Sequence, residues 1–491
     1  MEERRLGRKS RGSAALRGTV MYAGGLGLDT LLSLVTLSIV TRLISIETFS
    51  EFALFQVVAL PLLPLVDLGC GTSIVRDMAA KPDAPQRAEL QITLLASRAI
   101  IGFVAAALIA IVPAIFLPQY ATPLRIFAGT FFLWTFALAC GDALRAGERH
   151  GIVAAAIVVR AITRTLLTLG LVRAGWGLEG LLLGLGLSWG ISIIVLLVGL
   201  RGAFRARPSL ARFRGFLGFG APAAGYYITR NLGQLDRHLV KAGGRLEDAG
   251  LYQLAATPTQ AIDMLEFGAS LAIEPFLFGA KPTDLPALID RVYRWAATGL
   301  IASCIMLGLL GPETLHVLGP DTYRPALGAL PWLAYAAGMR ALARLIGYGA
   351  PHGRETRAWL VAGVVETTLA AGLILIVIGR FGPTGAAIAR YGAAIVALVA
   401  AAAMAGKANA PISAVVRSLI AATGSVIALA AIATPIGTIA PLWIRGALAV
   451  ALCVATFALM KPPRRRGASS GPGDKALGQV ADPELGAGRP E

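Results

Sequence analysis

Arginines and carboxylates stand inside long apolar stretches of this 491-residue chain. An ionised side chain in the middle of a membrane costs roughly 2.5 to 3.5 kcal/mol on insertion scales, so such residues face a cavity or a partner. Arg160 and Arg164 are four residues apart, and a helix places them on one face, about 6 Å apart along its axis. Two guanidinium groups at this spacing suit a diphosphate, because each binds phosphate oxygens in a bidentate manner.

The remaining ionisable residues of the apolar stretches form two sets of site candidates. The positive set, which would extend the pair of Arg160 and Arg164 into a cationic cleft, is Arg230 and Arg390. The acidic set, which would bind a coupling proton or sodium ion, is Glu366, Asp263, Glu266 and Asp29. A second arrangement stays open, in which each arginine pairs with a carboxylate of a neighbouring span and faces no cavity.

The elements that must position these residues are transmembrane helices. The mean hydropathy is +0.69, and only 15% of the residues are charged. A helix needs about 20 mainly apolar residues to cross the hydrocarbon core of a bilayer. The number of apolar stretches of this length predicts an all-α polytopic membrane protein of about fourteen transmembrane helices. Their expected ranges are 19–42, 53–74, 93–117, 123–143, 152–172, 180–200, 216–235, 249–272, 293–311, 325–345, 358–378, 384–405, 413–432 and 441–460.

The order of short motifs indicates that the chain is duplicated. Ala53-Leu54-Phe55-Gln56 is followed about two hundred residues later by Gly250-Leu251-Tyr252-Gln253, and the stretch 175–180 is followed similarly by 379–385. We therefore expect two pseudo-symmetric six-helix lobes around a central cleft, an arrangement that secondary transporters use for alternating access. The expected segments are a basic N-terminus 1–18, a first lobe 19–200, a basic linker 201–215, a second lobe 216–405, two extra helices 406–460 and a disordered tail 461–491.

The basic residues predict the orientation of the chain. The formal net charge is +17, and most lysines and arginines fall in short connections on one face of the predicted bundle. By the positive-inside rule this face and both termini are cytoplasmic, which leaves no surplus of charge for nucleic acid. The connection after the seventh span is an exception, because it places Arg237 on the outer face. Arg340 and Arg344 lie near a cytoplasmic helix end, where we expect them to extend to the lipid headgroups.

Several kinds of functional site are not indicated by the sequence. No phosphate-binding loop of the Gly-x-x-x-x-Gly-Lys-Ser/Thr type occurs, and we expect no cofactor. The four cysteines have no CxxC spacing, and the four histidines are isolated, so no metal site is expected. A membrane glycosyltransferase or polymer ligase is the enzyme alternative. It is disfavoured because every outward connection is short.

Four stretches, taken in order, resemble the multidrug/oligosaccharidyl-lipid/polysaccharide exporter superfamily, and more closely its branch of O-antigen and exopolysaccharide flippases. In this sequence they are Thr41 to Phe55, Asp67-Leu68-Gly69 with Ile74-Val75-Arg76, Gly218 to Pro222, and Leu235-Asp236-Arg237 with Gly250-Leu251-Tyr252. The first looks like an Arg-Leu span exit followed by an acidic and aromatic turn. Ser50 stands where the family often has glycine, and many members lack two C-terminal spans.

The resemblance implies a flippase of the bacterial inner membrane that serves surface polysaccharide synthesis, for lipopolysaccharide or exopolysaccharide. Its substrate would be a polyprenyl-diphosphate-linked oligosaccharide, with the diphosphate held by Arg160, Arg164, Arg230 and Arg390. The implied partners are this lipid-linked oligosaccharide, membrane lipids, a polysaccharide polymerase and chain-length proteins. A drug or cation exporter of the same superfamily, which would favour acidic cavity residues, and a peptidoglycan-precursor flippase are the alternatives.

Overall fold

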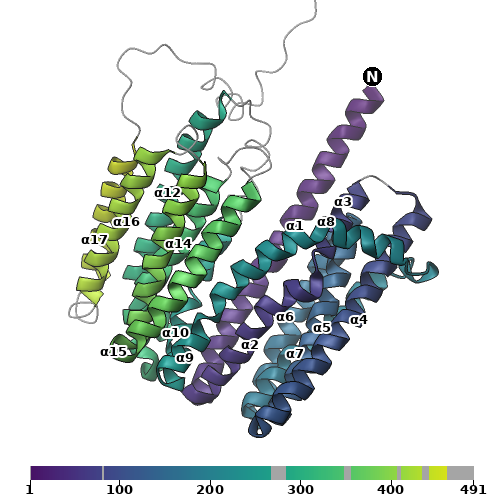
Figure 1. Ribbon diagram of the computed structural model, residues 1–491, viewed down its shortest axis with the longest axis horizontal. Coiled ribbons are helices and arrows are strands. Elements are labelled where there is room, and N and C mark those ends of the chain that lie inside the picture. The colour runs from purple at the N-terminus through teal and green to yellow at the C-terminus, as the bar shows by residue number, and fades with distance from the viewer. Residues whose placement is uncertain are drawn as a thin grey trace, which may run out of the picture.

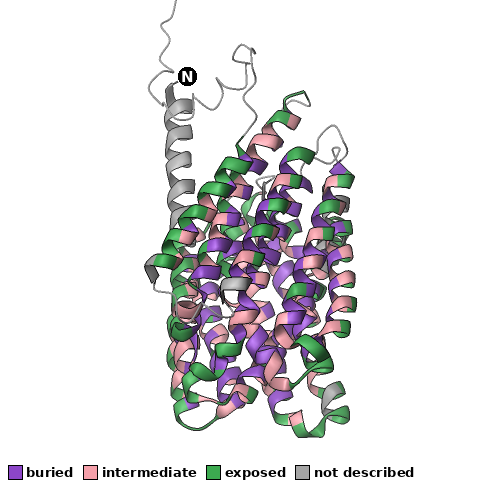
Figure 2. Ribbon diagram, turned by 90° about the vertical axis from the view of Figure 1, so that its left-hand side faces the viewer, coloured by how far each residue is buried: buried purple, intermediate pink, exposed green. Residues whose placement is uncertain are grey.

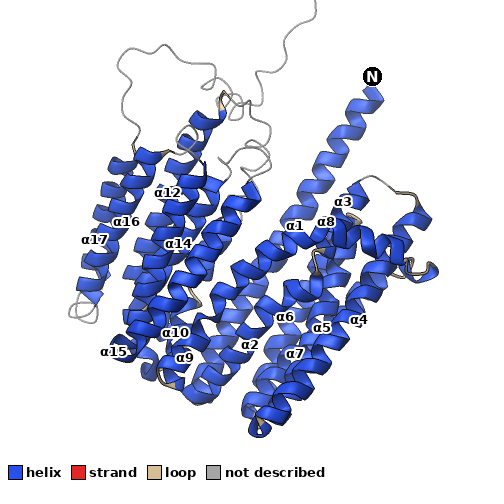
Figure 3. Ribbon diagram, in the orientation of Figure 1, coloured by secondary structure: helices blue, strands red, loops and turns tan. Residues whose placement is uncertain are grey.

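The computed structural model describes residues 2–79, 82–266, 283–347, 355–405, 411–433 and 442–461. Within these ranges the chain forms helices and no strand, which confirms the all-α fold (Figure 3). The first lobe consists of α1 (Glu2–Leu43), α2 (Ile46–Asp67), α3 (Cys70–Ala79), α4 (Ala84–Phe116), α5 (Ala121–Ala146), α6 (His150–Arg173) and α7 (Gly177–Gly199).

The second lobe follows a linker that contains the short 3-10 helix η2 (Ala203–Arg205). It consists of α8 (Leu210–Leu232), η3 (Gly233–Leu235), α9 (Asp236–Gly243), α10 (Leu246–Ala256), α12 (Leu285–Leu309), α13 (Gly311–Leu318), η4 (Asp321–Gly328), α14 (Leu330–Gly347) and α15 (Glu355–Ala405). The last two described helices, α16 (Ile412–Ala433) and α17 (Leu442–Met460), pack on α12 at the outer side of this lobe (Figure 1).

The described helices have the length and composition of a multi-pass membrane protein. Nine of them are long and apolar enough to cross a membrane, among the residues that the structure covers. One of these nine candidates, Leu360–Ala405, covers two of the expected spans. Buried residues concentrate in the interior of the bundle (Figure 2), whereas α4 exposes large apolar side chains such as Ile100, Phe103 and Leu108, as a lipid-facing helix does. The expected number of fourteen spans stays a prediction.

Glycines end helices at the two places where the repeated motifs predict a connection. Gly175 lies between α6 and α7 with a φ angle of 88°, and Gly177, the first residue of α7, has a φ angle of 48°. Gly382 has φ 55° and ψ −150°, and it breaks α15 into two antiparallel parts immediately before Pro383. Positive φ angles of this kind are accessible to glycine at no steric cost. The repeated Gly-rich stretches therefore mark corresponding turns of the two lobes.

The second transmembrane helix begins earlier than the sequence pattern predicts. The hydropathy pattern starts this span at residue 53, but α2 starts at Ile46 after a two-residue turn. The Ser45 side chain accepts a hydrogen bond from the backbone N–H of Thr48, at 3.3 Å, and Glu47 lies in the first turn. A serine N-cap and an acidic first turn both stabilise a helix start, so the expected acidic and aromatic turn is helical instead.

The connection after the seventh span, which carries Arg237, is helical. The chain continues from α8 through η3 directly into α9. Arg237 is only 8% exposed and Asp236 only 5%. The two side chains are bonded to each other at 3.1 Å, which offsets part of the cost of burying both charges.

The two lobes diverge toward the end of the bundle at which α1 begins, and they meet at the opposite end (Figure 1). There Phe49 and Leu54 of α2 are buried in the core of the second lobe, and the rings of Phe49 and Tyr323 form a T-shaped pair with centroids 5.8 Å apart. Thr41 and Arg42 at the end of α1 donate hydrogen bonds to the last carbonyls of α13. The first lobe thereby caps the C-terminus of a helix in the second lobe.

Helix α8 makes the reciprocal contact with the first lobe. Phe216 is fully buried in the core of that lobe, although the sequence pattern assigns it to the second, and its carbonyl accepts a hydrogen bond from Ser73 at 2.8 Å. Gly69 lies against Gly220, and a Cβ on either residue would overlap the backbone of the other. Gly69 also has a φ of 74° after Leu68, at the junction of α2 and α3. Two stretches that carry the family resemblance therefore meet at this contact.

Alanine at Gly220 is expected to destabilise the protein by about 1 to 3 kcal/mol, because the added methyl group forces α8 away from the α2–α3 junction. The apparent melting midpoint of the purified protein in detergent would report this loss. Gly218→Ala is the matched control, since no atom lies within 4 Å of its added Cβ. That variant should be neutral or more stable by up to about 1 kcal/mol. Equal midpoints for the two variants would contradict the close contact.

Candidate functional site

A cavity of about 390 Å³ lies between the two lobes. Its walls come from α1, α2, α6 and α7 of the first lobe and from α10 and residues 257–264 of the second. The charged residues of the lining are Asp29 and Arg164. Eight lining side chains are uncharged and polar: Thr30, Ser33, Thr36, Gln56, Thr168, Gln253, Thr257 and Gln260. We call this space the central cavity.

Asp29 holds both arginines of α6. Its two carboxylate oxygens accept from Arg160 at 2.7 Å and from Arg164 at 3.1 Å, and Arg164 also donates to Ser33. The guanidinium of Arg160 stacks on the ring of Trp189, 4.2 Å from its centroid. The helical spacing of the pair therefore brings them together as predicted. Of the two, only Arg164 lines the cavity, and Asp29 pairs with both instead of standing apart as a separate ion site.

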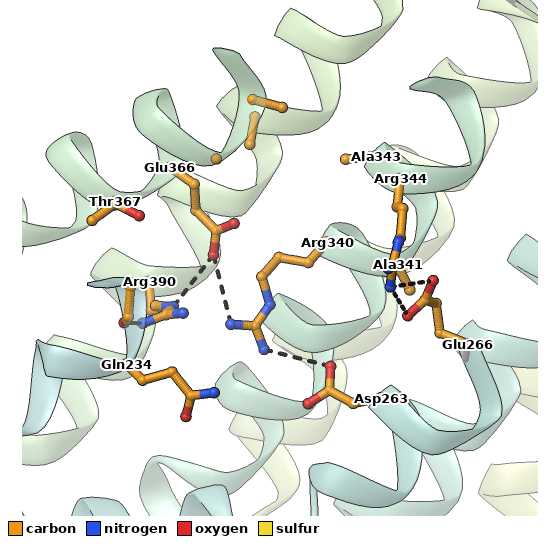
Figure 4. A pocket seen from close by; sticks show the side chains of 14 residues that line it. Gln234, Asp263, Glu266, Arg340, Ala341, Ala343, Arg344, Glu366, Thr367 and Arg390 are labelled. Atoms are coloured by element: carbon orange, nitrogen blue, oxygen red, sulfur yellow. Dashed lines mark hydrogen bonds and ion pairs between the residues drawn. The ribbon is translucent and has the colours of Figure 1, made fainter. Parts of the chain in front are cut away.

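A second cavity, of about 120 Å³, lies within the second lobe (Figure 4). We call it the second-lobe cavity. Four of the candidates from the sequence, Asp263, Glu266, Glu366 and Arg390, line it together with Arg340 and Arg344, which the sequence pattern places at the headgroups. The structure therefore gathers the acidic candidates other than Asp29 in one place.

Arg340 and Arg344 both form ion pairs in the second-lobe cavity. Arg344 bonds both oxygens of Glu266, at 3.1 and 2.9 Å. Arg340 lies between two carboxylates, 3.8 Å from Glu366 and 3.9 Å from Asp263 (Figure 4). A carboxylate partner offsets the cost of holding each guanidinium group in the interior of the lobe.

A buried network of four side chains adjoins the second-lobe cavity. Asp236 accepts hydrogen bonds from Arg390 at 2.5 Å, from the Tyr252 hydroxyl at 2.8 Å and from Arg237 at 3.1 Å. The three charged side chains are between 5% and 9% exposed. Arg390 also lies 3.4 Å from Glu366. Asp236 is not among the site candidates from the sequence, although its place beside Arg237 and near Tyr252 in the resembling motifs was an available signal.

The described candidate arginines are divided between two cavities. Arg164, which shares Asp29 with Arg160, lines the central cavity, whereas Arg390 lines the second-lobe cavity. The backbone of Arg230 lies in α8, but its side chain is outside the described residues. Glu366 Oε1 and Arg390 Nε are both buried, and neither atom has a hydrogen bond in the described part of the chain. The two atoms are 3.4 Å apart, so their contact is an ion pair and not a hydrogen bond. This carboxylate is therefore held by charge more than by fixed hydrogen bonds.

Comparison with known proteins identifies the family. A family described as "Polysaccharide biosynthesis protein" matches residues 15–278, more than half of the chain. The chain belongs to this polysaccharide biosynthesis protein family. The matched residues include Asp29, both arginines of α6, and three members of the buried network, Asp236, Arg237 and Tyr252. A search of curated protein sequences found no match.

Solved structures share the fold of this family member. "Lipid II flippase MurJ, inward closed conformation" has a TM-score of 0.60 at 12% sequence identity, and covers 90% of this chain and 98% of its own. An inward-facing "multidrug resistance MATE family transporter of the MOP superfamily" has a TM-score of 0.59 at 15% identity, covering 81% and 95%. An outward-facing transporter of the same description has a TM-score of 0.53 at 16% identity, covering 84% and 96%. The chain therefore has the fold of these membrane proteins.

Proposed function

We propose that this protein is a flippase that moves a polyprenyl-diphosphate-linked oligosaccharide across the bacterial inner membrane by alternating access. One observation carries the proposal: a pair of arginines shares a single carboxylate beside a polar cavity between the lobes. Membership of the polysaccharide biosynthesis protein family and the transporter fold support it.

The charges of the central cavity suit a diphosphate. Arg160 and Arg164 carry two positive charges against the one negative charge of Asp29, so the group keeps a net charge of +1. A diphosphate entering the cavity can replace Asp29 as the partner of Arg164 and form bidentate hydrogen bonds. The uncharged polar lining then faces the glycan, and the polyprenyl chain stays in the bilayer. A surplus of arginine over carboxylate favours this anionic substrate over the cationic drugs of the exporter alternative.

The second-lobe cavity supplies the coupling ion in this proposal. Its three arginines, Arg340, Arg344 and Arg390, are balanced by Asp263, Glu266 and Glu366. Binding of a proton or sodium ion at Glu366 weakens its attraction to Arg340 and Arg390, and this changes the contacts between α14 and the two parts of α15. Such a change in a lobe that moves as a unit is a means by which an ion gradient drives alternating access.

The orientation, location and partners in this proposal follow from the basic residues and the resemblance. The end of the bundle at which α1 begins is cytoplasmic, because the basic linker and the basic connections lie there. The lobes diverge toward this end, so the described state accepts substrate from the cytoplasm (Figure 1). A polysaccharide polymerase and chain-length proteins would use the product on the other side of the membrane.

Loss of the protein is expected to leave lipid-linked oligosaccharide on the cytoplasmic leaflet, and Arg160→Ala/Arg164→Ala is expected not to clear it. Each charged hydrogen bond contributes about 1.5 to 3 kcal/mol, so loss of both contacts predicts at least a tenfold slower transport, since about 1.4 kcal/mol is tenfold. Leaflet-resolved labelling of the extracted lipids in complemented cells would measure the difference.

Two controls separate transport from folding. Arg173→Ala alters an exposed arginine in the last turn of the same helix and should clear the intermediate normally. Addition of Asp29→Asn to the double variant removes the unpaired carboxylate, so it should restore the amount of protein in the membrane but not transport. Accumulation of a peptidoglycan precursor, with surface polysaccharide unchanged, would refute the proposed substrate and support the peptidoglycan alternative.

A further inference from the structure

Most hydroxyl groups of the central cavity have no proton to offer a ligand. Thr30, Ser33, Thr36 and Thr257 each donate to the backbone carbonyl four residues earlier. A hydroxyl group has one donor hydrogen and two acceptor lone pairs, so these four present only lone pairs to the cavity. A ligand rich in oxygen acceptors therefore needs its hydrogen-bond donors from the arginine or from side-chain amides.

The amide of Gln253 is oriented by a neighbouring arginine. Its oxygen accepts a hydrogen bond from Nε of Arg237 at 2.6 Å. A guanidinium group can only donate, so the oxygen of Gln253 must face Arg237 and the NH₂ group must point the other way. Gln253 lines the central cavity, which places its two N–H donors toward a ligand. By contrast, the side-chain amides of Gln56 and Gln260 have no hydrogen bond to the described residues, so each amide can rotate.

The orientation of Gln253 is set before any ligand binds. Arg237 is held from its other side by Asp236 at 3.1 Å and by the backbone carbonyl of Gln234 at 3.0 Å. Asp236 is in turn fixed by Arg390 and by Tyr252, whose side chain is fully buried. Ion pairs in a buried network with satisfied hydrogen bonds are rigid. An oriented donor of this kind binds an acceptor without the entropic cost of ordering it.

We propose that Gln253 is the hydrogen-bond donor that recognises an acceptor oxygen of the glycan, and that Arg237 positions it. The inference rests on the proposed function, because it takes the contents of the central cavity to be a lipid-linked sugar. Arg160 and Arg164 bind the diphosphate, which is common to all such lipids, whereas Gln253 recognises the attached sugar by a hydrogen bond. Gln253 is thus a specificity-determining residue, and Arg237 acts on specificity without touching the substrate.

The test compares two probes that differ only in the sugar: polyprenyl diphosphate, and polyprenyl diphosphate carrying N-acetylglucosamine. Native mass spectrometry of the purified full-length protein in detergent gives a dissociation constant for each, and their ratio is the sugar preference. One neutral hydrogen bond contributes about 0.5 to 1.5 kcal/mol, equal to roughly 2- to 12-fold in this ratio. Gln253→Met should bring the ratio to near 1 while the affinity for the bare diphosphate stays within twofold of wild type.

Three further variants define the role of the amide. Gln253→Glu keeps the bond to Arg237 but offers the cavity an acceptor, so it should also lose the preference. Arg237→Met frees the amide to rotate, and it should weaken the preference although it leaves Gln253 intact. Gln260→Met changes an unlocked amide of the same cavity and should keep the full preference.

The outcomes distinguish this inference from the function on which it rests. Failure of the wild type to bind either lipid would refute the proposed function itself. Binding of both lipids by the wild type with equal affinity, or an unchanged preference in Gln253→Met, would overturn the role of Gln253 and leave the flippase proposal standing. Loss of the preference in Gln253→Met and Gln253→Glu, with Gln260→Met unaffected, supports the inference even where Arg237→Met fails to fold.

Discussion

A disulfide bond between α2 and α10 is expected to stop transport completely. In the described state Ser50 of α2 lies directly against Gly250 of α10, at the end of the bundle where the lobes meet. A Cβ built on Gly250 is 3.3 Å from the Cβ of Ser50, close to the separation of about 3.5 to 4.5 Å in a disulfide. Alternating access requires the lobes to separate at this end, and a covalent link prevents it.

The experiment uses Ser50→Cys/Gly250→Cys in a protein whose four native cysteines, Cys70, Cys140, Cys304 and Cys453, are replaced by alanine. Transport of lipid-linked oligosaccharide in membrane vesicles is measured after oxidation and again after reduction. Reduction should restore the activity that oxidation removes, whereas each single-cysteine variant should be insensitive to oxidant. Undiminished transport by the cross-linked protein would show that the lobes need not part at this contact.

Replacement of Asp236 by alanine is expected to lower the free energy of unfolding by about 3 to 5 kcal/mol, because it leaves the buried guanidinium groups of Arg237 and Arg390 without their shared carboxylate. Titration of the purified protein with a denaturing detergent measures the loss. The variant Glu247→Ala, which breaks an exposed pair with Arg245 at the start of the neighbouring helix α10, should cost less than about 1 kcal/mol.

A double-mutant cycle decides whether charge explains this loss. Asp236→Asn keeps a polar partner for Tyr252 but removes the negative charge, and Arg390→Met removes one of the two positive charges. If the buried ion pair dominates, the combined variant should be more stable than the sum of the two single losses predicts. Strict additivity of the losses would contradict this account of the Asp236 network.

The sequence predicts the local features of the fold well, because turn and cap chemistry act over a few residues. The repeated motifs mark Gly175, Gly177 and Gly382 as connections, and each has a positive φ. The hydropathy pattern does not predict the early start of α2, because it depends on a long apolar stretch. The helix start is instead indicated by two residues, the N-cap Ser45 and the acidic Glu47, which can also be read from the sequence. Helix ends are set by such single residues, which a hydropathy window averages away.

The sequence predicts the site less well, because the partner of a buried charge can lie anywhere in the chain. Helical spacing reveals the pair of Arg160 and Arg164, but its partner Asp29 lies 131 residues from Arg160. The ion pair of Arg344 is likewise invisible in the sequence, because its partner Glu266 lies 78 residues away. Periodicity gives the face of a helix, whereas the depth and the partner follow from tertiary packing.

The stretches that carry the family resemblance contact one another in pairs across the two lobes. The Asp67-Leu68-Gly69 stretch meets the Gly218–Pro222 stretch through Gly69 and Gly220. Likewise the stretch from Thr41 to Phe55 meets Gly250 of the fourth stretch through Ser50. Ser50 stands where the resemblance leads one to expect glycine, and a glycine on the facing helix leaves room for its hydroxyl. Each stretch therefore matters for a contact between lobes that its own residues do not reveal.

The reciprocal packing of α2 and α8 makes each half of the chain dependent on the other. A polypeptide that ended in the basic linker would lack Phe216 and would leave an unfilled hole in the core of the first lobe. The remaining fragment, in turn, would lack Phe49 and Leu54 of α2 in the core of the second lobe. Neither half of the protein has a complete interior alone. Separate expression of the two halves would therefore leave both cores with a hole that only the other half fills.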